Sequence, residues 1–311
     1  MNIFESIDEI NKDENTVLTI GTFDGIHKGH KFLFDRLKQY SVQNKLRNVV
    51  ITFEPHPRTV VSDFKINLLT TFEEKAELLL QLGIENLLVL KFSKAFAEQT
   101  SEEFITNIIC NKIGVKHIII GHDHKFGKNR NGDDNELIEL GEKNNFSVEC
   151  IGPIKNEENI ISSTKIRNLL IDGDIKSANN MLGRNYCFHG TVVKGVSRGK
   201  ILGFPTANIK VVNENKLIPK NGVYIVKAQI ESETVYGVMN VGLRPTFEDT
   251  INVVIEVHLF EFNKNIYAKK IKIELLDRIR DEIKFNNKEE LIYQIGKDKN
   301  QAVQFVGKII N

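Results

Sequence analysis

The pattern of apolar residues changes once along the chain, near its middle, and this change limits the possible folds more than any other feature. Between Thr16 and Ile151, short β-branched runs alternate with segments whose apolar residues recur at helical spacing. This alternation is typical of a parallel sheet with crossover helices. Capping boxes that begin at Thr71 and Thr100 support helices between the strands. The expected strands are Val17–Ile20, Val49–Phe53, Asn86–Leu90, His117–Ile120 and Ser147–Ile151.

After two short helices that end near Leu182, the chain consists of strand-like runs with little helix between them. This half predicts an antiparallel barrel or sandwich, closed by a final helix from Asn287 towards Val306. We therefore expect an α/β protein with a doubly wound parallel-sheet domain at residues 1–182 and an antiparallel β-barrel domain with a terminal helix at residues 183–311. The strands expected in the second half are Phe188–Lys194, Val223–Ile230, Thr234–Val241, Val253–Phe260 and Lys269–Leu276.

Charge and composition exclude several classes of protein. The 311 residues include 42 Lys and Arg against 41 Asp and Glu, a formal net charge of +1. No global charge attracts this chain to nucleic acid or anionic lipid, so any phosphate site must be local. No apolar run approaches the roughly 18 residues of a membrane span. We expect no nucleic-acid partner and no membrane partner.

The N-terminal segment and the spacing of the cysteines both indicate a cytoplasmic protein. The first ten residues carry acids where a secretory leader carries basic residues. Cys110, Cys150 and Cys187 are too widely spaced for a metal knuckle or a redox pair. The sequence therefore predicts a cytoplasmic protein whose three cysteines are buried free thiols.

The most informative segment is Gly21-Thr22-Phe23-Asp24-Gly25-Ile26-His27-Lys28-Gly29-His30, which follows the first expected strand and leads into a helical pattern from Lys31. A glycine-rich turn from strand to helix lets the backbone approach a phosphate, and the free N–H groups of the helix favour negative charge there. His27 and His30 are three residues apart and lie on one face of the first turn. Two such imidazoles can stabilise charge at an α-phosphorus under attack. Paired histidines are also compatible with a metal site or with simple helix capping.

A second segment, Ile161-Ser162-Ser163-Thr164-Lys165-Ile166-Arg167, follows the last strand of the same domain. Hydroxyls, a lysine and an arginine at a helix start suit a phosphate clamp. In a doubly wound sheet the loops after the strands meet at one edge, so this segment is expected to face the first one across a nucleotide.

The second domain opens with a glycine-rich stretch, His189–Asn208, between two strand-like runs. Such loops can surround phosphate with backbone N–H groups. Thr206 and Asn208 are neutral oxygen donors two residues apart, which on an extended segment can complete a Mg²⁺ shell made mainly of ATP oxygens and water. A purely structural turn and strand is the alternative.

These segments resemble known families. The first resembles the HxGH signature of the nucleotidyltransferase superfamily, and Ile161–Arg167 resembles its SSTxIR segment. More closely, Phe53–Arg58, Gly121–Gly127 and Arg130–Asp133 resemble motifs in the adenylyltransferase half of the bacterial bifunctional riboflavin kinase/FAD synthetases. The resemblance implies that His27, His30 and Arg167 are catalytic. It also implies that ATP phosphates contact Gly21, Thr22, Phe23, Asp24, Gly25, Ser162, Ser163 and Thr164, and that the flavin contacts Asp123, for which a turn-forming role is the alternative, and Phe126.

The second half resembles riboflavin kinase through its glycine loop, Pro205-Thr206-Ala207-Asn208, Gly237–Thr246, Glu256-Val257-His258 and Ile279–Phe285. The resemblance implies that Glu256 is the catalytic base for the ribityl 5′-hydroxyl, and that Thr206 and Asn208 hold Mg²⁺. A rim glutamate paired with a lysine is the alternative for Glu256. The remaining implied contacts are Gly195, Ser197, Arg198, Gly199, Lys200 and Gly203 for ATP, and Arg280 for the flavin.

Three residues depart from the family pattern: Thr22 in place of asparagine, His124 in place of phenylalanine, and Lys200 in place of arginine. Lys200 keeps the charge but loses the bidentate fork of arginine. The leading hypothesis is an enzyme that makes FMN from riboflavin and ATP, and then FAD from FMN and ATP, with small molecules as its partners. Its oligomeric state is left open between a monomer and a weak homo-oligomer. The alternatives are a nucleotidyltransferase with another phosphorylated substrate, or a flavin-binding regulator that has lost one activity.

Overall fold

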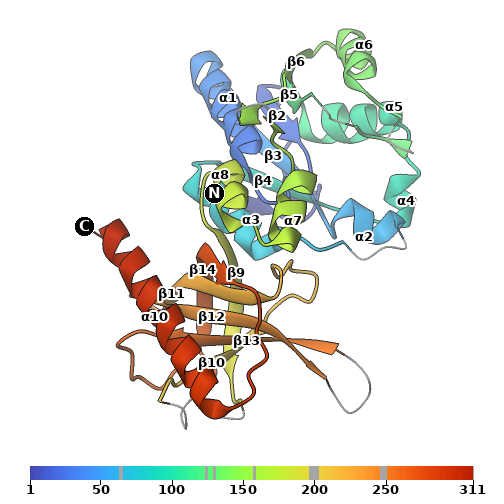
Figure 1. Cartoon of the computed structure of the whole chain (residues 1–311). Coiled ribbons are helices and arrows are strands. Elements are labelled where there is room, and N and C mark those ends of the chain that lie inside the picture. The colour runs from blue at the N-terminus through green and yellow to red at the C-terminus, as the bar shows by residue number, and fades with distance from the viewer. Residues whose placement is uncertain are drawn as a thin grey trace. The chain divides into compact units, whose positions relative to one another are not determined.

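The computed structural model describes residues 1–62, 66–122, 125–128, 131–156, 159–195, 203–245 and 251–310 (Figure 1). Contacts divide the chain into two compact units, Met1–Ser163 and Thr164–Asn311. Among the described residues, no helix combines the length and the apolar character needed to cross a bilayer. Each unit is built on its own sheet.

The first unit contains a six-stranded sheet in the order β1-β4-β3-β2-β5-β6, and every neighbouring pair in it runs parallel. Its strands are β1 (Asn2–Phe4), β2 (Thr16–Ile20), β3 (Arg47–Glu54), β4 (Asn86–Lys91), β5 (His117–Gly121) and β6 (Ser147–Ile151). Its helices are α1 (Lys28–Asn44), α2 (Pro57–Val61), α3 (Phe72–Gln81), α4 (Lys94–Ala97), α5 (Ser101–Glu103), the π-helix η1 (Phe104–Ile113) and α6 (Asp134–Asn144), and a small hairpin pairs β7 (Lys155–Asn156) with β8 (Asn159–Ile160).

Two apolar clusters lie on opposite faces of this sheet. Alternate residues of β2 divide between them, with Leu18 in the cluster formed with η1 and α6, and Val17 in the cluster formed with α1 and α3. Helices therefore cover both faces, which confirms the doubly wound parallel sheet.

The strand order reverses at β2, which has β3 on one side and β5 on the other. In open α/β sheets, ligands bind beyond the carboxyl ends of the strands at such a switch point. The turn that begins at Gly21 leaves β2 at this point.

Most expected elements of the first unit are confirmed, including both capping boxes. The prediction that the first helix starts at Lys31 is wrong, because α1 begins at Lys28 with His27 as its N-cap. The sequence prediction also missed β1, a strand of three residues at the sheet edge. The expected burial of the three thiols is wrong as well, because Cys110 and Cys187 are half-buried and Cys150, on the edge strand β6, is exposed.

In the second unit, six strands close into a barrel in the order β10-β13-β12-β11-β14-β9, and neighbouring strands pair antiparallel. This confirms the barrel. The strands are β9 (Tyr186–Val193), β10 (Ala207–Val211), β11 (Gly222–Ile230), β12 (Glu233–Pro245), β13 (Ile251–Leu259) and β14 (Lys270–Arg280). The helices are α7 (Ser163–Asp172), α8 (Ile175–Leu182) and α10 (Lys288–Ile310). The first residue of α7 belongs to the first unit. Of these strands, only β10 was not among those expected.

Helix α10 runs along the outside of the barrel (Figure 1), where Ala302 and Val306 pack near Tyr236 and Val238 of β12. The predicted cap is present, because the Glu290 N–H donates to Asn287 Oδ1 over 2.8 Å. Alternate residues of β13, such as Ile255 and Val257, are buried inside the barrel. Glu256 lies between them in the sequence, so its side chain faces outwards.

Candidate functional site

The turn after β2 has an unusual backbone. Phe23 and Ile26 have φ angles of +47° and +38°, in the left-handed region that non-glycine residues avoid, and Gly25 has φ of +87°. Such residues cost about 1–3 kcal/mol each and persist where the surroundings hold them. Both side chains are buried, at 3% and 4% exposure. The packing around these side chains therefore holds the turn in one strained conformation.

Asp24 is the main support of the turn. Its carboxylate is 2% exposed and accepts hydrogen bonds from the Leu69 N–H (3.1 Å), the Thr70 N–H (2.9 Å) and the Thr70 hydroxyl (3.2 Å). The Gly25 N–H in turn donates to Thr70 Oγ1 over 3.0 Å. These bonds fix the predicted phosphate-binding turn to the segment before α3.

His27 and His30 lie together at the start of α1. Their rings stack with centroids 3.7 Å apart and an interplanar angle of 16°. The His30 N–H donates to His27 Nδ1 over 3.3 Å, so a neutral His27 ring carries its proton on Nε2. The structure thus places both predicted catalytic imidazoles at a helix N-terminus, where negative charge is favoured.

The second predicted segment reaches the first one. Ser163, at the start of α7, donates its hydroxyl hydrogen to the Asp24 carbonyl oxygen over 2.8 Å, across 139 positions of sequence. Ser162 precedes Ser163 and is half-buried, Thr164 is exposed, and Arg167 lies one helical turn further along α7, half-buried. The expected approach of the two segments is present at Ser163.

The predicted flavin loop is only partly described. Phe126 is 8% exposed, belongs to the apolar cluster with η1, and pairs through backbone bonds of 3.2 Å and 3.0 Å with Gly132. Asp123 and His124 lie outside the described residues.

On the barrel, Glu256 lies between two carboxamides. In the strand register, Glu256 of β13 is directly opposite Asn208 of β10 on one side and Asn240 of β12 on the other. Side chains directly opposite in antiparallel strands share a face, with Cβ atoms roughly 4.5–5.5 Å apart. The predicted base and one predicted metal ligand are therefore neighbours.

The residues around Asn208 fit a magnesium ion that ATP largely coordinates. A Cβ at Gly195 would lie 2.0 Å from Asn208 Nδ2, so glycine there leaves space for the amide. Within the described part of the chain, no group of three or more His, Cys, Asp or Glu side chains is placed to hold a metal. Neutral oxygens from Thr206 and Asn208, with phosphates and water, are a donor set that Mg²⁺ accepts.

His258 connects the strand of Glu256 to the segment of Thr206. Its Nδ1 lies 2.9 Å from the Pro205 carbonyl oxygen, which can only accept, so Nδ1 carries the proton. Its ring meets Phe204 and Phe260 edge-on. Burial is the largest cause that lowers the pKa of His258.

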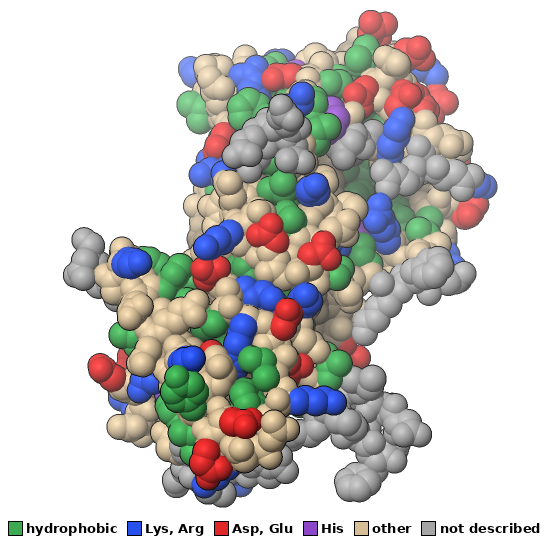
Figure 2. Space-filling model, viewed as in Figure 1, with side chains coloured by type: hydrophobic (Ala, Val, Ile, Leu, Met, Phe, Trp, Pro, Cys, Tyr) green, Lys and Arg blue, Asp and Glu red, His purple; other side chains and the backbone are tan. Residues whose placement is uncertain are grey.

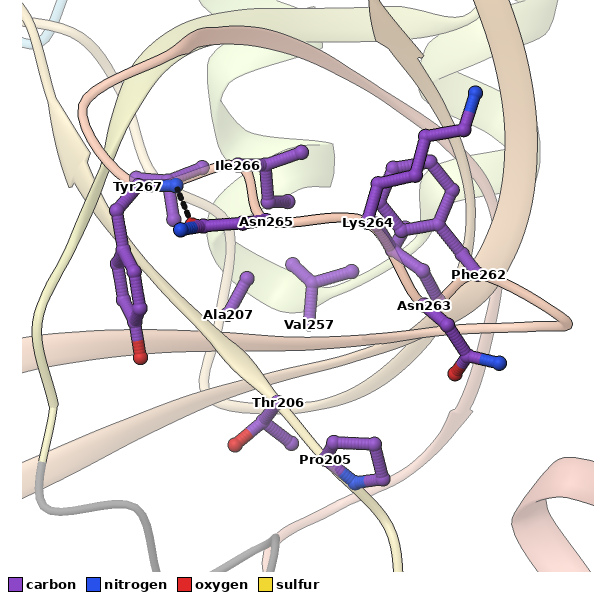
Figure 3. A pocket seen from close by; sticks show the side chains of 12 residues that line it. Pro205, Thr206, Ala207, Val257, Phe262, Asn263, Lys264, Asn265, Ile266 and Tyr267 are labelled. Carbon is purple, nitrogen blue, oxygen red and sulfur yellow. Dashed lines mark hydrogen bonds between the residues drawn. The ribbon is translucent and has the colours of Figure 1, made fainter.

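A cavity of about 260 Å³ lies beside Thr206. Figure 3 shows Pro205 and Thr206 at one edge, Ala207 and Val257 in the middle, and the loop Phe262–Tyr267 on the other side. Within that loop the Tyr267 N–H donates to Asn265 Oδ1 over 3.1 Å. The cavity is apolar at its centre, with amides at its rim.

The remaining predicted ATP and flavin contacts of the barrel unit are either outside the described residues or bonded to other parts of the chain. Gly195 and Gly203 are described, the latter with φ of +83°, whereas Ser197, Arg198, Gly199 and Lys200 lie outside the described residues. Arg280, predicted to bind the flavin, directs Nε and Nη2 to the buried carboxylate of Asp298 on α10, at 2.7–3.1 Å. The structure thus shows Arg280 joining β14 to α10.

Sequence reasoning gave no role to two polar residues near these sites, the buried Lys75 and the half-buried His258. A signal existed for Lys75, because it occupies a position on the apolar face of α3 with Phe72 and Leu79. The loop Phe262–Tyr267 gave no signal, since its cavity depends on strands distant in sequence. Acidic and basic side chains are interspersed on the face shown in Figure 2, in keeping with local phosphate sites.

Comparisons with known proteins agree with both halves. A family model described as FAD synthetase matches residues 9–165, and one described as riboflavin kinase matches residues 182–306. Bifunctional riboflavin kinase/FMN adenylyltransferases from Listeria monocytogenes and from Buchnera aphidicola of Acyrthosiphon pisum are 37% and 39% identical, covering 96% and 94% of this chain and 94% and 93% of their own. The protein of that name from Escherichia coli K12 is 34% identical and covers 94% of each chain.

A solved structure from Streptococcus pneumoniae, described as a macrolide-efflux protein, matches with a TM-score of 0.87 and 31% identity over 96% of both chains. That description belongs to the other protein. The two family models match consecutive parts of the chain, and the relatives that match almost its whole length share one name. This chain therefore belongs to the bifunctional riboflavin kinase/FMN adenylyltransferase family.

Proposed function

We propose that this chain makes FAD from riboflavin in two ATP-dependent reactions. The barrel unit transfers the γ-phosphoryl group of ATP to riboflavin, giving FMN and ADP. The parallel-sheet unit then joins FMN to the AMP part of a second ATP, giving FAD and pyrophosphate. The observation that carries the second reaction is the pair of stacked histidines at the switch point of the sheet, with Ser163 bonded to the same turn.

In adenylyl transfer, a phosphate oxygen of FMN attacks the α-phosphorus of ATP, and the bond from that phosphorus to the bridging oxygen of pyrophosphate breaks. His27 and His30 donate to the phosphate oxygens, and Arg167 adds a fixed positive charge. Donors held in advance where charge develops lower the barrier without having to reorganise. No covalent intermediate with the protein is needed.

In phosphoryl transfer, Glu256 accepts the proton of the ribityl 5′-hydroxyl as its oxygen attacks the γ-phosphorus. Asn208 and Asn240, on the flanking strands, orient the carboxylate. Thr206 and Asn208 would hold Mg²⁺, which when bound offsets negative charge on the phosphates. The cavity beside Thr206 has the size and apolar centre to take the base of ATP.

The partners of this protein are then small molecules: riboflavin, FMN and ATP. We further propose a cytoplasmic protein, with neither nucleic acid nor membrane as a partner, that acts as a monomer or a weak homo-oligomer. The flavin contacts at Asp123, Phe126 and Arg280 belong to the same proposal, as does the division of the two activities at residues 1–182 and 183–311.

The first test separates the reactions by substitution in the sheet unit. The protein is incubated with riboflavin, ATP and Mg²⁺, and FMN, FAD, ADP and pyrophosphate are followed over time. His30→Ala is expected to lower FAD formation by about 10²- to 10³-fold, because a donor to the transition state is lost, while FMN accumulates normally. If both products fell together, one reaction per unit would be the wrong assignment. FMN without FAD from the unaltered protein would mean a silent sheet unit.

The converse variant is Glu256→Gln. Losing a general base typically costs about 10²- to 10⁴-fold, so FMN formation is expected to stop while supplied FMN is still converted to FAD. Phosphorylation of riboflavin at a near-normal rate would remove Glu256 from the role of base.

A further inference from the structure

Lys75 of α3 is a buried cation that neither proposed reaction uses directly. The residue is 4% exposed, on the face of the helix that packs against the sheet. Burial is the largest cause that lowers the pKa of Lys75, and the charges of Asp24 and Glu54 oppose it. Burying an ammonium group costs several kcal/mol unless partners compensate. The groups that compensate the charge of Lys75 therefore indicate its role.

One partner leads from Lys75 to the phosphate-binding turn. The ammonium group of Lys75 donates to Thr52 Oγ1 on β3 over 3.1 Å. The Thr52 hydroxyl donates to the Thr22 carbonyl oxygen over 3.3 Å. Two hydrogen bonds thus connect α3 through β3 to Thr22, the residue before Phe23, which is one of the two left-handed non-glycine residues of the turn.

The other partners are carboxylates. Asp24 is 2% exposed within the turn, and Glu54 is half-buried at the end of β3. Burial raises the pKa of Glu54, and the charge of Lys75 opposes this rise. Thr52, which binds Lys75, lies two residues before Glu54 and therefore on the same face of β3. Thr52 also bonds the turn two residues before Asp24. The ammonium group of Lys75 thus lies in the neighbourhood of both acidic side chains, behind a turn that is proposed to hold a triphosphate. Without it, both would repel the phosphates through a medium of low dielectric constant.

We propose that Lys75 is a positioning residue for adenylyl transfer: it fixes the Thr22 carbonyl through Thr52 and offsets the negative charge of Asp24 and Glu54 behind the ATP phosphates. Lys75 acts through Thr52 and through its charge, without touching ATP or FMN. The inference rests on the proposed function of the turn.

The test uses Lys75→Met, which keeps the length of the side chain and removes its charge. The adenylylation rate is measured as pyrophosphate release from supplied FMN over a range of ATP concentrations. Because misplaced catalytic groups cost up to about 100-fold, kcat/KM for ATP is expected to fall about 10- to 100-fold, chiefly through a higher KM. Riboflavin phosphorylation by the same protein should stay within about twofold. Lys12→Met, which removes an exposed lysine paired with Glu14, is the matched control and should change neither rate.

A second substitution separates charge from packing. Adding Glu54→Gln to Lys75→Met removes one of the two unbalanced carboxylates, so the KM for ATP is expected to return most of the way to normal. A purely structural lysine would gain nothing from this change, and absence of rescue would overturn the charge-balancing role.

The hydrogen-bonded connection is tested at Thr52, which also covers the case where Lys75→Met does not fold. Thr52→Val removes the hydroxyl and is expected to raise the KM for ATP, whereas Thr52→Ser keeps the hydroxyl and should not. Equal values for both variants would overturn the connection. An unaltered protein that makes no FAD would refute the proposed function itself, whereas normal FAD synthesis by Lys75→Met would refute only the role of Lys75.

Discussion

At the scale of single residues, His258 holds two parts of the proposed kinase site together without taking part in the reaction. Its Nδ1–H group bonds the Pro205 carbonyl, directly before Thr206, while Glu256 lies two residues earlier on the same strand. The bond therefore sets the distance between the proposed base and a proposed metal ligand.

His258→Phe keeps an aromatic ring between Phe204 and Phe260 and removes the donor. A displaced Thr206 is expected to lower kcat/KM for riboflavin phosphorylation about tenfold, and FAD formation from supplied FMN serves as the internal control. Equal kinase rates in the variant and the unaltered protein would show that the bond positions nothing.

Prediction from sequence succeeded for residues whose chemistry is visible in a motif and failed for those whose role depends on burial. His27 and His30 could be named because a glycine-rich turn surrounds them. The support that Asp24 gives through Leu69 and Thr70 could not, since it depends on a contact across 45 positions. Helix capping was one alternative for the paired histidines, and His27 is indeed the N-cap of α1, but the stacking of the two rings could not be predicted from the sequence.

At the scale of elements, α1 is anchored to the sheet by its middle as well as by its first turn. Arg36 forms a bidentate ion pair with Glu149 of β6 at 2.7 Å and 2.9 Å, and Tyr40 stacks on His117 of β5 at 3.9 Å. His117 also lies 2.6 Å from Ser147 Oγ and 3.5 Å from Glu149. These contacts fix the helix that presents His27 and His30.

His117 makes this anchor sensitive to pH. Burial is the main cause that lowers the pKa of His117 below its unfolded value, although Glu149 opposes the shift. The neutral ring is thus favoured in the folded state, so its contribution to stability is complete above about pH 6.5 and is lost as the pH falls through the folded pKa. Urea unfolding followed by circular dichroism at pH 7.5 and 5.5 should show a smaller drop in midpoint for His117→Phe than for the unaltered protein. Identical drops would mean that His117 does not contribute.

The four central parallel strands, β2 to β5, were predictable because they are buried on both faces and therefore read as continuous apolar runs. In contrast, β10 escaped prediction because it has five residues and only one of them, Ile209, is fully buried. Short elements at the edge of a core carry little pattern, whatever their importance to the site.

At the scale of the whole molecule, the change of pattern at Leu182 and the packing of the chain divide it differently. Packing places the residues from Thr164 onwards with the barrel. The Lys220 N–H donates to the Leu170 carbonyl of α7 over 3.0 Å, and Asn179 of α8 donates to the Leu275 carbonyl over 2.8 Å. A pattern of strands and helices shows where the type of element changes, but not against which neighbour a helix packs.

This division inside α7 bears on any attempt to express one half of the chain alone. A fragment that ends before α7 lacks Arg167. A fragment that ends at Leu182 carries α7 and α8 without their bonding partners, which are Lys220 before β11 and Leu275 of β14. A barrel fragment beginning at Gly183 leaves those same strands uncovered. Because α7 carries Arg167 and packs with the barrel unit, neither cut yields a fragment that keeps both the proposed catalytic residue and the contacts that hold its helix.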